Sequence, residues 1–322
     1  PAVLSVEGVA SSLKNGDTVV VDGSEGAVIV NPDDNTVAEY SKKRDAFLAE
    51  RKELENYRGR ETKSASGEVY ELFCNIGKPE DAVKAVDADG EGVGLFRTEF
   101  LFMDRTSIPT EDEQFEAYKK AALILKGKSL IIRTLDIGGD KDIPYLGLEK
   151  EENPFMGFRA IRYCLKNREL FKSQIKAILR ASAFGDIKIM FPLITTMDEL
   201  REGKKLVAEC KADLRNMGIN FNENIQVGVM VETASAAVIA DMLAQEADFF
   251  SIGTNDLTGY TMACDRGNND VSYLYSPLQP SVLRMIKRTI ECGVQNGISV
   301  GMCGEAAANK LMIPLLISFG LT

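Results

Sequence analysis

Two hydrophobic patterns divide this chain, and the second begins after Gly67. From there, apolar runs of about five to eight residues alternate with amphipathic stretches of about ten to twenty. The apolar runs predict strands near residues 70–76, 92–98, 129–135, 187–193, 226–232, 248–253 and 298–303. The amphipathic stretches predict helices near residues 79–88, 111–126, 168–182, 197–217, 233–246, 279–296 and 306–319. This alternation is typical of a parallel sheet covered by helices.

The fold class that this pattern predicts is α/β, with a (β/α)8 barrel of the TIM type. A closed barrel of this type needs eight strands, and the sequence ends at Thr322, just after the seventh predicted helix. We therefore expect a barrel truncated before its eighth strand, as in a fragment of a longer protein. The alternative is an open barrel, whose exposed edges would invite pairing with another chain.

The first 67 residues follow a different pattern. DTVVVDG and GAVIVNP are short β-rich runs bounded by Gly, Asp and Pro. The stretch that follows is rich in charge and in good helix formers, which predicts a solvated connecting helix. We divide the chain into a short β-containing segment (1–32), a linker helix with its connector (33–67) and a barrel domain (68–322).

Composition narrows the classes of function. Hydrophobic residues make up 45% of the chain and charged residues 27%, and no apolar run is long enough to cross a bilayer, so we expect no membrane role. A net charge of −10 disfavours non-specific binding of nucleic acid. The six cysteines include no CxxC pair and predict reduced thiols in a cytosolic protein. Because the chain has no histidine, catalysis must use carboxylates, thiols, lysines or a partner's groups.

Several apolar runs end in a charged or reactive residue, and strand ends of a β/α barrel meet at one mouth. Glu232 and Asp256 are separated by 24 positions, one β/α/β step, so we expect them on adjacent strand ends. Two carboxylates with room for water and substrate oxygens suit Mg²⁺ or Mn²⁺ better than zinc. The alternative is that each carboxylate caps the helix that follows it.

Four arginines form a second candidate group: Arg97, Arg133, Arg159 and Arg266. Guanidinium groups bind phosphate and carboxylate through two parallel hydrogen bonds, which favours an anionic ligand at this mouth. The alternative is local ion pairing, for example of Arg97 with Glu99 or of Arg266 with Asp265.

Three further residues have candidate roles. Lys141 follows the glycine pair of DIGGDK, a turn that can present N–H groups and an ammonium to an anion, although tight turns use glycine pairs for other reasons too. The Asn255 amide either binds a phosphate oxygen or caps a helix. Cys303 lies in GMCGE, where the flanking glycines predict an accessible thiol that can donate a proton; the alternative is a buried structural thiol.

Eight motifs follow one another along the chain: GVGLFRTEFLFMDR, RTLDIGGDK, ENPFMGFRAIR, IMFPLITTMDEL, GVMVETASAA, FFSIGTNDLTGYTMACDRGN, LYSPLQPSVL and GMCGEAA. Together they closely resemble Enzyme I of the bacterial phosphoenolpyruvate:sugar phosphotransferase system. Pyruvate phosphate dikinase and phosphoenolpyruvate synthase share the barrel and are more distant relatives.

The resemblance implies that the barrel binds phosphoenolpyruvate (PEP) and carries the interface of a homodimer. On the matching positions, Mg²⁺ would be held by Glu232 and Asp256, and Cys303 would protonate the enolate of pyruvate. The residues implied to hold the phosphoryl group are Arg97, Arg133 and Arg266 with Asn255, and Arg159 would lie nearby in the pocket.

The resemblance also implies partners that this chain lacks. The family transfers the phosphoryl group to a histidine of an N-terminal domain, and then to a histidine phosphocarrier protein, as the first step of cytoplasmic sugar phosphotransfer. Residues 1–32 resemble only the tail of that domain. We therefore expect PEP binding by this chain, with the histidine supplied in trans. The alternatives are a related dikinase, synthase or lyase barrel, and a PEP sensor without turnover.

Overall fold

The computed structural model describes residues 2–3, 6, 8–103, 105–138 and 143–321. The chain forms two compact units, Pro1–Arg60 and Glu61–Thr322. The elements of the first unit are α1 (Val9–Ser12), β1 (Val19–Asp22), β2 (Ala27–Val30), α2 (Asp34–Leu54) and the 3-10 turn η1 (Glu55–Tyr57).

The first unit contains one hairpin and one long helix. β1 and β2 pair antiparallel, as the two β-rich runs predicted. α2 begins where the Asp33 side chain accepts a hydrogen bond from the Thr36 N–H, an N-cap that satisfies one of the free donors of the first turn. No residue of α2 is buried, in agreement with the solvated helix predicted from its charge.

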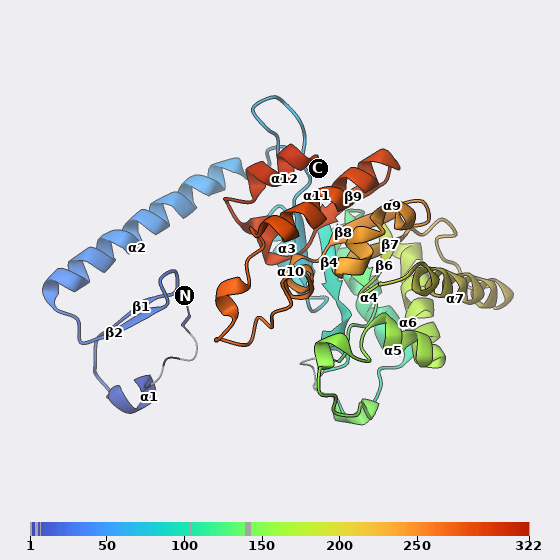
Figure 1. Cartoon of the computed structure of the whole chain (residues 1–322), viewed down its shortest axis with the longest axis horizontal. Coiled ribbons are helices and arrows are strands. Elements are labelled where there is room, and N and C mark those ends of the chain that lie inside the picture. Colours follow the sequence, from blue (N-terminus) through green and yellow to red (C-terminus); the bar gives the residue numbers. More distant parts are fainter. Residues whose placement is uncertain (1, 4–5, 7, 104, 139–142, 322) are drawn as a thin grey trace. The chain divides into compact units, whose positions relative to one another are not determined.

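The second unit is built on a parallel sheet of seven strands in sequence order (Figure 1). These strands are β3 (Phe73–Ile76), β4 (Gly92–Arg97), β5 (Ser129–Arg133), β6 (Ile187–Phe191), β7 (Val227–Val231), β8 (Phe249–Ile252) and β9 (Ser299–Met302). Each lies within the range predicted for it, and the central strands β5 to β8 are buried along most of their length, as their apolar runs predicted.

Helices lie around the outside of this sheet (Figure 1). The α-helices are α3 (Asp81–Asp87), α4 (Glu111–Leu125), α5 (Ile161–Lys166), α6 (Arg168–Ala181), α7 (Met197–Asn216), α8 (Ala234–Val238), α9 (Ala240–Leu243), α10 (Thr254–Met262), α11 (Pro280–Gln295) and α12 (Ile313–Phe319). The 3-10 turns are η2 (Thr98–Leu101), η3 (Pro144–Leu146), η4 (Pro154–Met156), η5 (Ser182–Phe184), η6 (Ser272–Leu274) and η7 (Glu305–Ala308). Within the described ranges, none of the helices combines the length and the apolar character needed to traverse a bilayer.

Two predicted helices are interrupted, and neither α5 nor α10 lies within a predicted helix range. The stretch 233–246 forms α8 and α9, which are separated at Ile239, where the backbone leaves the helical region (φ −97°, ψ 20°). The stretch 306–319 forms η7 and then α12. A proline in the first turn of α12 favours a helix start there, because its missing N–H is not needed at that position.

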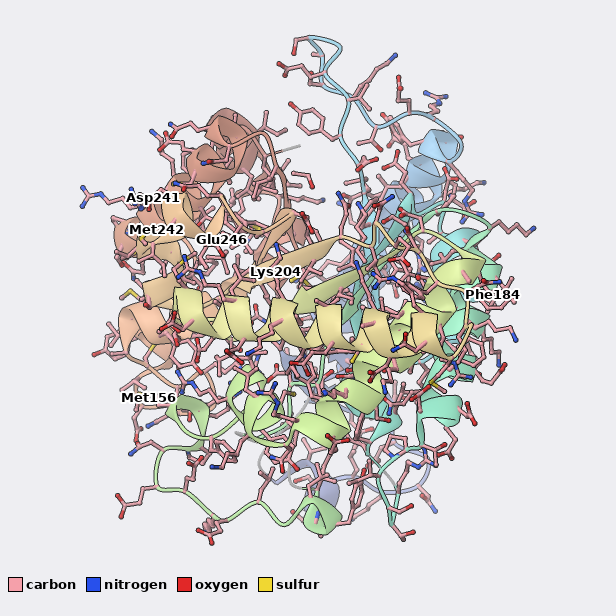
Figure 2. The ribbon with its side chains drawn as sticks, turned by 90° about the vertical axis from the view of Figure 1, so that its right-hand side faces the viewer. Met156, Phe184, Lys204, Asp241, Met242 and Glu246 are labelled. Atoms are coloured by element: carbon pink, nitrogen blue, oxygen red, sulfur yellow. The ribbon has the colours of Figure 1, made fainter. Side chains whose placement is uncertain are left out.

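The outer helices are fixed by local capping and by surface ion pairs. α7 begins with a capping box in which Thr196 and Glu199 bond each other's backbone N–H groups. Farther along α7, Lys204 donates to the Glu246 main-chain carbonyl, and Arg201 pairs with the Glu246 carboxylate at 2.6 Å. Figure 2 shows α7 crossing the front of the barrel, with Lys204 and Glu246 close together.

Two apolar layers lie on the two faces of the sheet. The larger cluster fills the space between the sheet and the helices. A smaller cluster inside the curl of the sheet consists of Leu95, Ile131, Met190, Met230, Phe249 and Cys303. The inside of the sheet is therefore packed with side chains, as in barrels of this type.

The sheet curls without closing in the part of the chain that the structure describes. Its seven strands run from β3 at one edge to β9 at the other, with no ladder joining these two edges in that part. The edges approach each other at one end, where the Asn75 side-chain amide donates to the Cys303 carbonyl at 2.9 Å. The prediction of a barrel-type α/β fold that lacks its eighth strand is confirmed for these residues.

Candidate active site

The candidate site lies at the carboxyl ends of the strands, beside the inner face of the sheet. Successive side chains of a strand point to opposite faces, and Leu95 and Ile131 face the inner cluster. Arg97 and Arg133 follow them by two positions, so they share that face, and they stand opposite each other in the register of β4 and β5. Glu232 reaches the same end of the sheet directly after β7. The carboxyl ends of neighbouring strands thus bring these side chains together.

Arg133 lies buried between two carboxylates. Its Nη1 is 3.0 Å from Asp136 Oδ2, and its Nη2 contacts Glu99 Oε1. Burial acts to lower the pKa of Arg133, but the carboxylates of Glu99 and Asp136 outweigh it and raise the pKa above its usual value. Arg133 is therefore held as a fixed cation. Glu99, the partner that the sequence suggested for Arg97, contacts Arg133.

Arg159 bridges two acidic residues from different elements. Its Nη2 lies 2.8 Å from Asp136 Oδ1 and 3.3 Å from Asp256 Oδ2. The side chain is only 5% exposed, so these pairs lie in a region of low dielectric. Asp136 thus joins Arg133 and Arg159 into one buried network.

The backbone beside Arg159 allows little freedom. A Cβ at Gly138 would come within 2.5 Å of the Arg159 Cβ, so glycine is needed for this close approach. The next residue, Ala160, has φ 53° and ψ −128°, a conformation that side-chain-bearing residues rarely adopt. Such strain persists only where the surrounding contacts hold it.

Glu232 is a buried carboxylate with few compensating partners. It is 2% exposed, and its Oε1 accepts a hydrogen bond from the Leu193 N–H at 2.7 Å. Burial, followed by the negative charge of Asp256, raises the pKa of Glu232 to about 8. A Cβ at Gly253 would come within 2.8 Å of Glu232 Oε2, so this glycine provides the space that the carboxylate occupies.

The alternative that these carboxylates cap helices is not what the structure shows. Thr233 is the N-cap of α8, and its side chain accepts from the Ala236 N–H. Gly253 is the N-cap of α10, and Asp256 and Asn255 lie within that helix. The side chain of Asn255 approaches Glu305 at 3.4 Å, through both its amide nitrogen and its oxygen.

The expectation of an accessible thiol at Cys303 is wrong. Cys303 is 8% exposed, and its Sγ lies 3.7 Å from the Ile252 carbonyl. The following glycine, Gly304, serves a different purpose, because a Cβ there would collide with Thr254. Burial raises the pKa of Cys303 above its ordinary value of 9.0, so the thiol keeps its proton at neutral pH.

The remaining candidates lie nearer the solvent. Arg97 and Arg266 are exposed, although the charge of Arg97 still acts on the Cys303 thiol. Arg266 lines a cavity of about 700 Å³ together with Phe155. Lys141 lies outside the described residues, so its predicted role stays a prediction.

The donor set fits a hard divalent cation. No cluster of three or more cysteine, aspartate or glutamate residues in the described part of the chain is arranged as a metal site. Glu232 and Asp256 instead form a pair of carboxylates, close enough for the charge of one to raise the pKa of the other. Mg²⁺ is bound in proteins through one or two carboxylates together with water and substrate oxygens. A divalent cation would favour the ionised form of the buried Glu232 beside the partly exposed Asp256.

Sequence reasoning missed Asp136 and the Leu193 N–H, and it paired Glu99 with Arg97 and not with Arg133. Asp136 and Glu99 are the partners of Arg133, and the Leu193 N–H is the hydrogen-bond donor to Glu232. Asp136 follows Arg133 by three positions in RTLD, so this spacing was an available signal. A backbone donor leaves no signal in a sequence.

Comparison with known proteins identifies the family. A family model described as PEP-utilising enzyme, PEP-binding domain, matches residues 51–322. Two phosphoenolpyruvate-protein phosphotransferases are similar to this chain over 321 residues. The one from Staphylococcus carnosus (strain TM300) is 49% identical to it, and the one from Bacillus subtilis (strain 168) is 50% identical. Each alignment covers 100% of this chain and 56% of the relative, so the chain spans a little over half the length of these relatives.

Among solved structures, a HpcH/Hpal aldolase/citrate lyase family protein from Burkholderia cenocepacia J2315 is 17% identical, with a TM-score of 0.46. The match covers 76% of this chain and 83% of that chain. The family match and the two close relatives agree with the motifs found in the sequence. The chain belongs to the family of PEP-utilising enzymes, whose PEP-binding domain its residues 51–322 match.

Proposed function

We propose that this chain is the PEP-binding part of a phosphoenolpyruvate-protein phosphotransferase. It binds PEP with Mg²⁺ and passes the phosphoryl group to a histidine that another part of the full protein supplies, releasing pyruvate. The observation that carries the proposal is the approach of two buried arginines, Arg133 and Arg159, to the carboxylate pair of Glu232 and Asp256. The names of relatives about half identical to this chain support it.

The arginines bind and orient the anionic substrate. Arg133 is fixed by its carboxylate partners before any ligand arrives, and Arg97 and Arg266 are exposed to solvent. Guanidinium groups preorganised in this way stabilise the charge that spreads over a phosphoryl group during transfer. Mg²⁺, held by Glu232 and Asp256, would neutralise charge on the phosphoryl and enolate oxygens.

Cys303 acts as the proton donor in this mechanism. The bond between phosphorus and the enolate oxygen of PEP breaks as the bond between phosphorus and the histidine nitrogen forms. The enolate left behind takes a proton at its methylene carbon from the Cys303 thiol and becomes pyruvate, and the thiolate regains a proton from water. A thiol with a raised pKa suits this role because it is protonated before the step.

The wider setting that we propose rests on the resemblance to the family. The acceptor is an N-terminal phosphohistidine domain, of which residues 1–32 are the tail, followed by a linker helix and connector (33–67) and the barrel (68–322). The boundary between the compact units, after Arg60, falls within this connector and supports the division. The phosphoryl group then passes to the histidine phosphocarrier protein in the cytoplasm, for sugar transport, and the barrels pair as a homodimer.

Titration calorimetry with PEP tests the proposal. The experiment uses this chain with and without Mg²⁺, alongside Glu232→Gln. We expect metal-dependent binding that Glu232→Gln weakens by more than the roughly 10- to 100-fold cost of losing an outer-shell partner of a metal. Glu223→Gln, which changes an exposed glutamate paired with Arg215, is the matched control and should bind like the parent chain.

The outcomes separate the candidate functions. Equal binding by the parent and Glu232→Gln would rule out the metal assignment. If PEP binds but no phosphoryl group reaches a histidine domain added in trans, the chain is a PEP sensor and not part of a phosphotransferase.

A further inference from the structure

Tyr260 shares one face of α10 with Asp256. The two residues are four positions apart in this helix, a spacing that places side chains on the same side. Arg159 donates to both: its Nη2 lies 3.3 Å from Asp256 Oδ2, and its Nη1 lies 3.3 Å from the Tyr260 hydroxyl. The phenol therefore holds the same guanidinium as one of the two candidate metal ligands.

The Tyr260 hydroxyl also bonds a loop. It donates to the main-chain carbonyl of Phe155 in η4. A phenol has one proton to donate, so once that proton is committed to Phe155, the oxygen can only accept from Arg159. Burial raises the pKa of Tyr260 to about 12, so the phenol keeps this proton at neutral pH. One hydroxyl thus fixes a guanidinium and a loop carbonyl relative to each other.

The loop that Tyr260 holds forms part of a cavity wall. The ring of Phe155 lies 5.8 Å from the guanidinium carbon of Arg159, within the range of a cation–π contact. Phe155 and Arg266 line the same cavity of about 700 Å³. Movement of η4 would therefore change the surroundings of Arg159 and the shape of this cavity together.

We propose that Tyr260 is a positioning residue of the site: its hydroxyl fixes Arg159 beside Asp256 and anchors the Phe155 wall of the cavity for an anionic substrate. The positioning rests on the hydrogen bonds described above. The identity of that substrate as PEP rests on the proposed function. Without the hydroxyl, Arg159 keeps its two hydrogen bonds to Asp136 but loses the one at Nη1. The hydrogen bond between η4 and α10 through Tyr260 is lost as well.

Tyr145 provides a matched control for this proposal. Its hydroxyl donates to the main-chain carbonyl of Phe102, and its side chain is half-buried like that of Tyr260. Tyr145→Phe thus removes the same kind of hydrogen bond without touching Arg159. A general loss of stability would affect both variants, whereas a positioning effect is confined to Tyr260→Phe.

The first measurement needs no ligand. Hydrogen exchange of residues 154–160 and the rate at which phenylglyoxal modifies Arg159 are followed by mass spectrometry in the parent chain, Tyr260→Phe and Tyr145→Phe. Arg159 is 5% exposed in the parent, so its modification should be slow there. We expect faster exchange and faster modification in Tyr260→Phe alone. Unchanged rates in Tyr260→Phe, or equal increases in both variants, would overturn the proposal.

The second measurement is the affinity for PEP in the presence of Mg²⁺. Losing one hydrogen bond to a charged group should raise the dissociation constant of Tyr260→Phe about tenfold, with no change in Tyr145→Phe. Parent-like affinity of Tyr260→Phe would overturn the role in substrate binding. If the parent chain binds no PEP, the proposed function fails, while the exchange and modification rates still decide whether Tyr260 positions Arg159.

Discussion

The two halves of the candidate site differ in how their charges are balanced. On the side of β4 and β5, Arg133 lies between the carboxylates of Glu99 and Asp136. On the side of β7 and β8, Glu232 is buried with a hydrogen bond from the Leu193 N–H, and its pKa is raised to about 8. The buried cation is thus paired directly with carboxylates, whereas the lowering effect of Arg133 and Arg159 on the pKa of Glu232 is outweighed by burial and by the charges of Asp256 and Asp136.

This difference indicates what each half does before a ligand binds. Nη1 and Nη2 of Arg133 each contact a carboxylate, so its guanidinium group is held in place before any ligand binds. A buried carboxylate beside another carboxylate is disfavoured, and a bound cation relieves the repulsion. The arginine half is therefore preorganised, whereas the carboxylate half would be stabilised by a bound cation.

Removing a carboxylate partner of Arg133 should have the largest effect on the free energy of unfolding. Glu99→Ala removes one partner of a buried ion pair, and losing a partner in this way typically lowers the free energy of unfolding by about 3–5 kcal/mol. Urea unfolding of the two proteins measures this difference. Glu80→Ala, which removes an exposed partner of Lys120, is the control and should cost less than about 1 kcal/mol. Equal losses in the two variants would show that Arg133 does not depend on Glu99.

The contribution of Glu232 to the free energy of unfolding should depend on pH. The folded chain without metal holds a proton on Glu232 up to about pH 8, whereas the unfolded chain releases it near the ordinary value of 4.5. The folded state therefore binds more protons between these values, and the free energy of unfolding falls as pH rises through this window. This fall in the free energy of unfolding is at most several kcal/mol, since each pKa unit corresponds to about 1.4 kcal/mol.

Urea unfolding of the parent chain and Glu232→Gln between pH 5 and pH 9 isolates this contribution, because glutamine does not titrate. We expect the variant to gain stability relative to the parent as pH rises, and Mg²⁺ to remove that gain by stabilising the parent above pH 8. A constant difference across the pH range would contradict the raised pKa of Glu232.

The sequence could predict the fold because the strands carry their own signal. The run GVGLFR is buried along most of its length and appears as β4 where its apolar pattern predicted a strand. The break at Ile239 was not predicted, although Val238 and Ile239 are β-branched and are weaker helix formers than the alanines around them. Local pattern thus predicts where elements exist better than where they break.

The site was predictable for side chains at strand ends and less so for the groups that hold them. Glu232 and Asp256 could be placed from their spacing of one β/α/β step. The Leu193 N–H could not, because the left-handed backbone that carries it (φ 55°) depends on the chain's path after β6. The glycines beside Cys303 suggested exposure, but Gly304 is needed for contact with Thr254.

A smaller effect should come from the strained backbone beside Arg159. Ala160→Gly places at φ 53° a residue that adopts positive φ without penalty. Relief of strain of order 1–3 kcal/mol should outweigh the added freedom of the unfolded chain, about 0.4–1 kcal/mol. We expect a rise in the thermal unfolding midpoint. Ala208→Gly, in the exposed interior of α7, is the matched control and should lower the midpoint. Lower midpoints in both variants would show that Ala160 carries no strain.

The smallest effect concerns the pKa of Cys303, because charges from both halves of the site act on its thiol. Burial is the main cause of its raised pKa, Glu232 raises it further, and Arg133 and Arg97 lower it. Alkylation of Cys303, followed by mass spectrometry as a function of pH, should therefore have its midpoint above 9.0. Removing the charge of Glu232 with Glu232→Gln should lower the midpoint, and Arg97→Gln should raise it. Opposite shifts would show that the thiol lies between an anionic and a cationic half, and shifts in the same direction would contradict that arrangement.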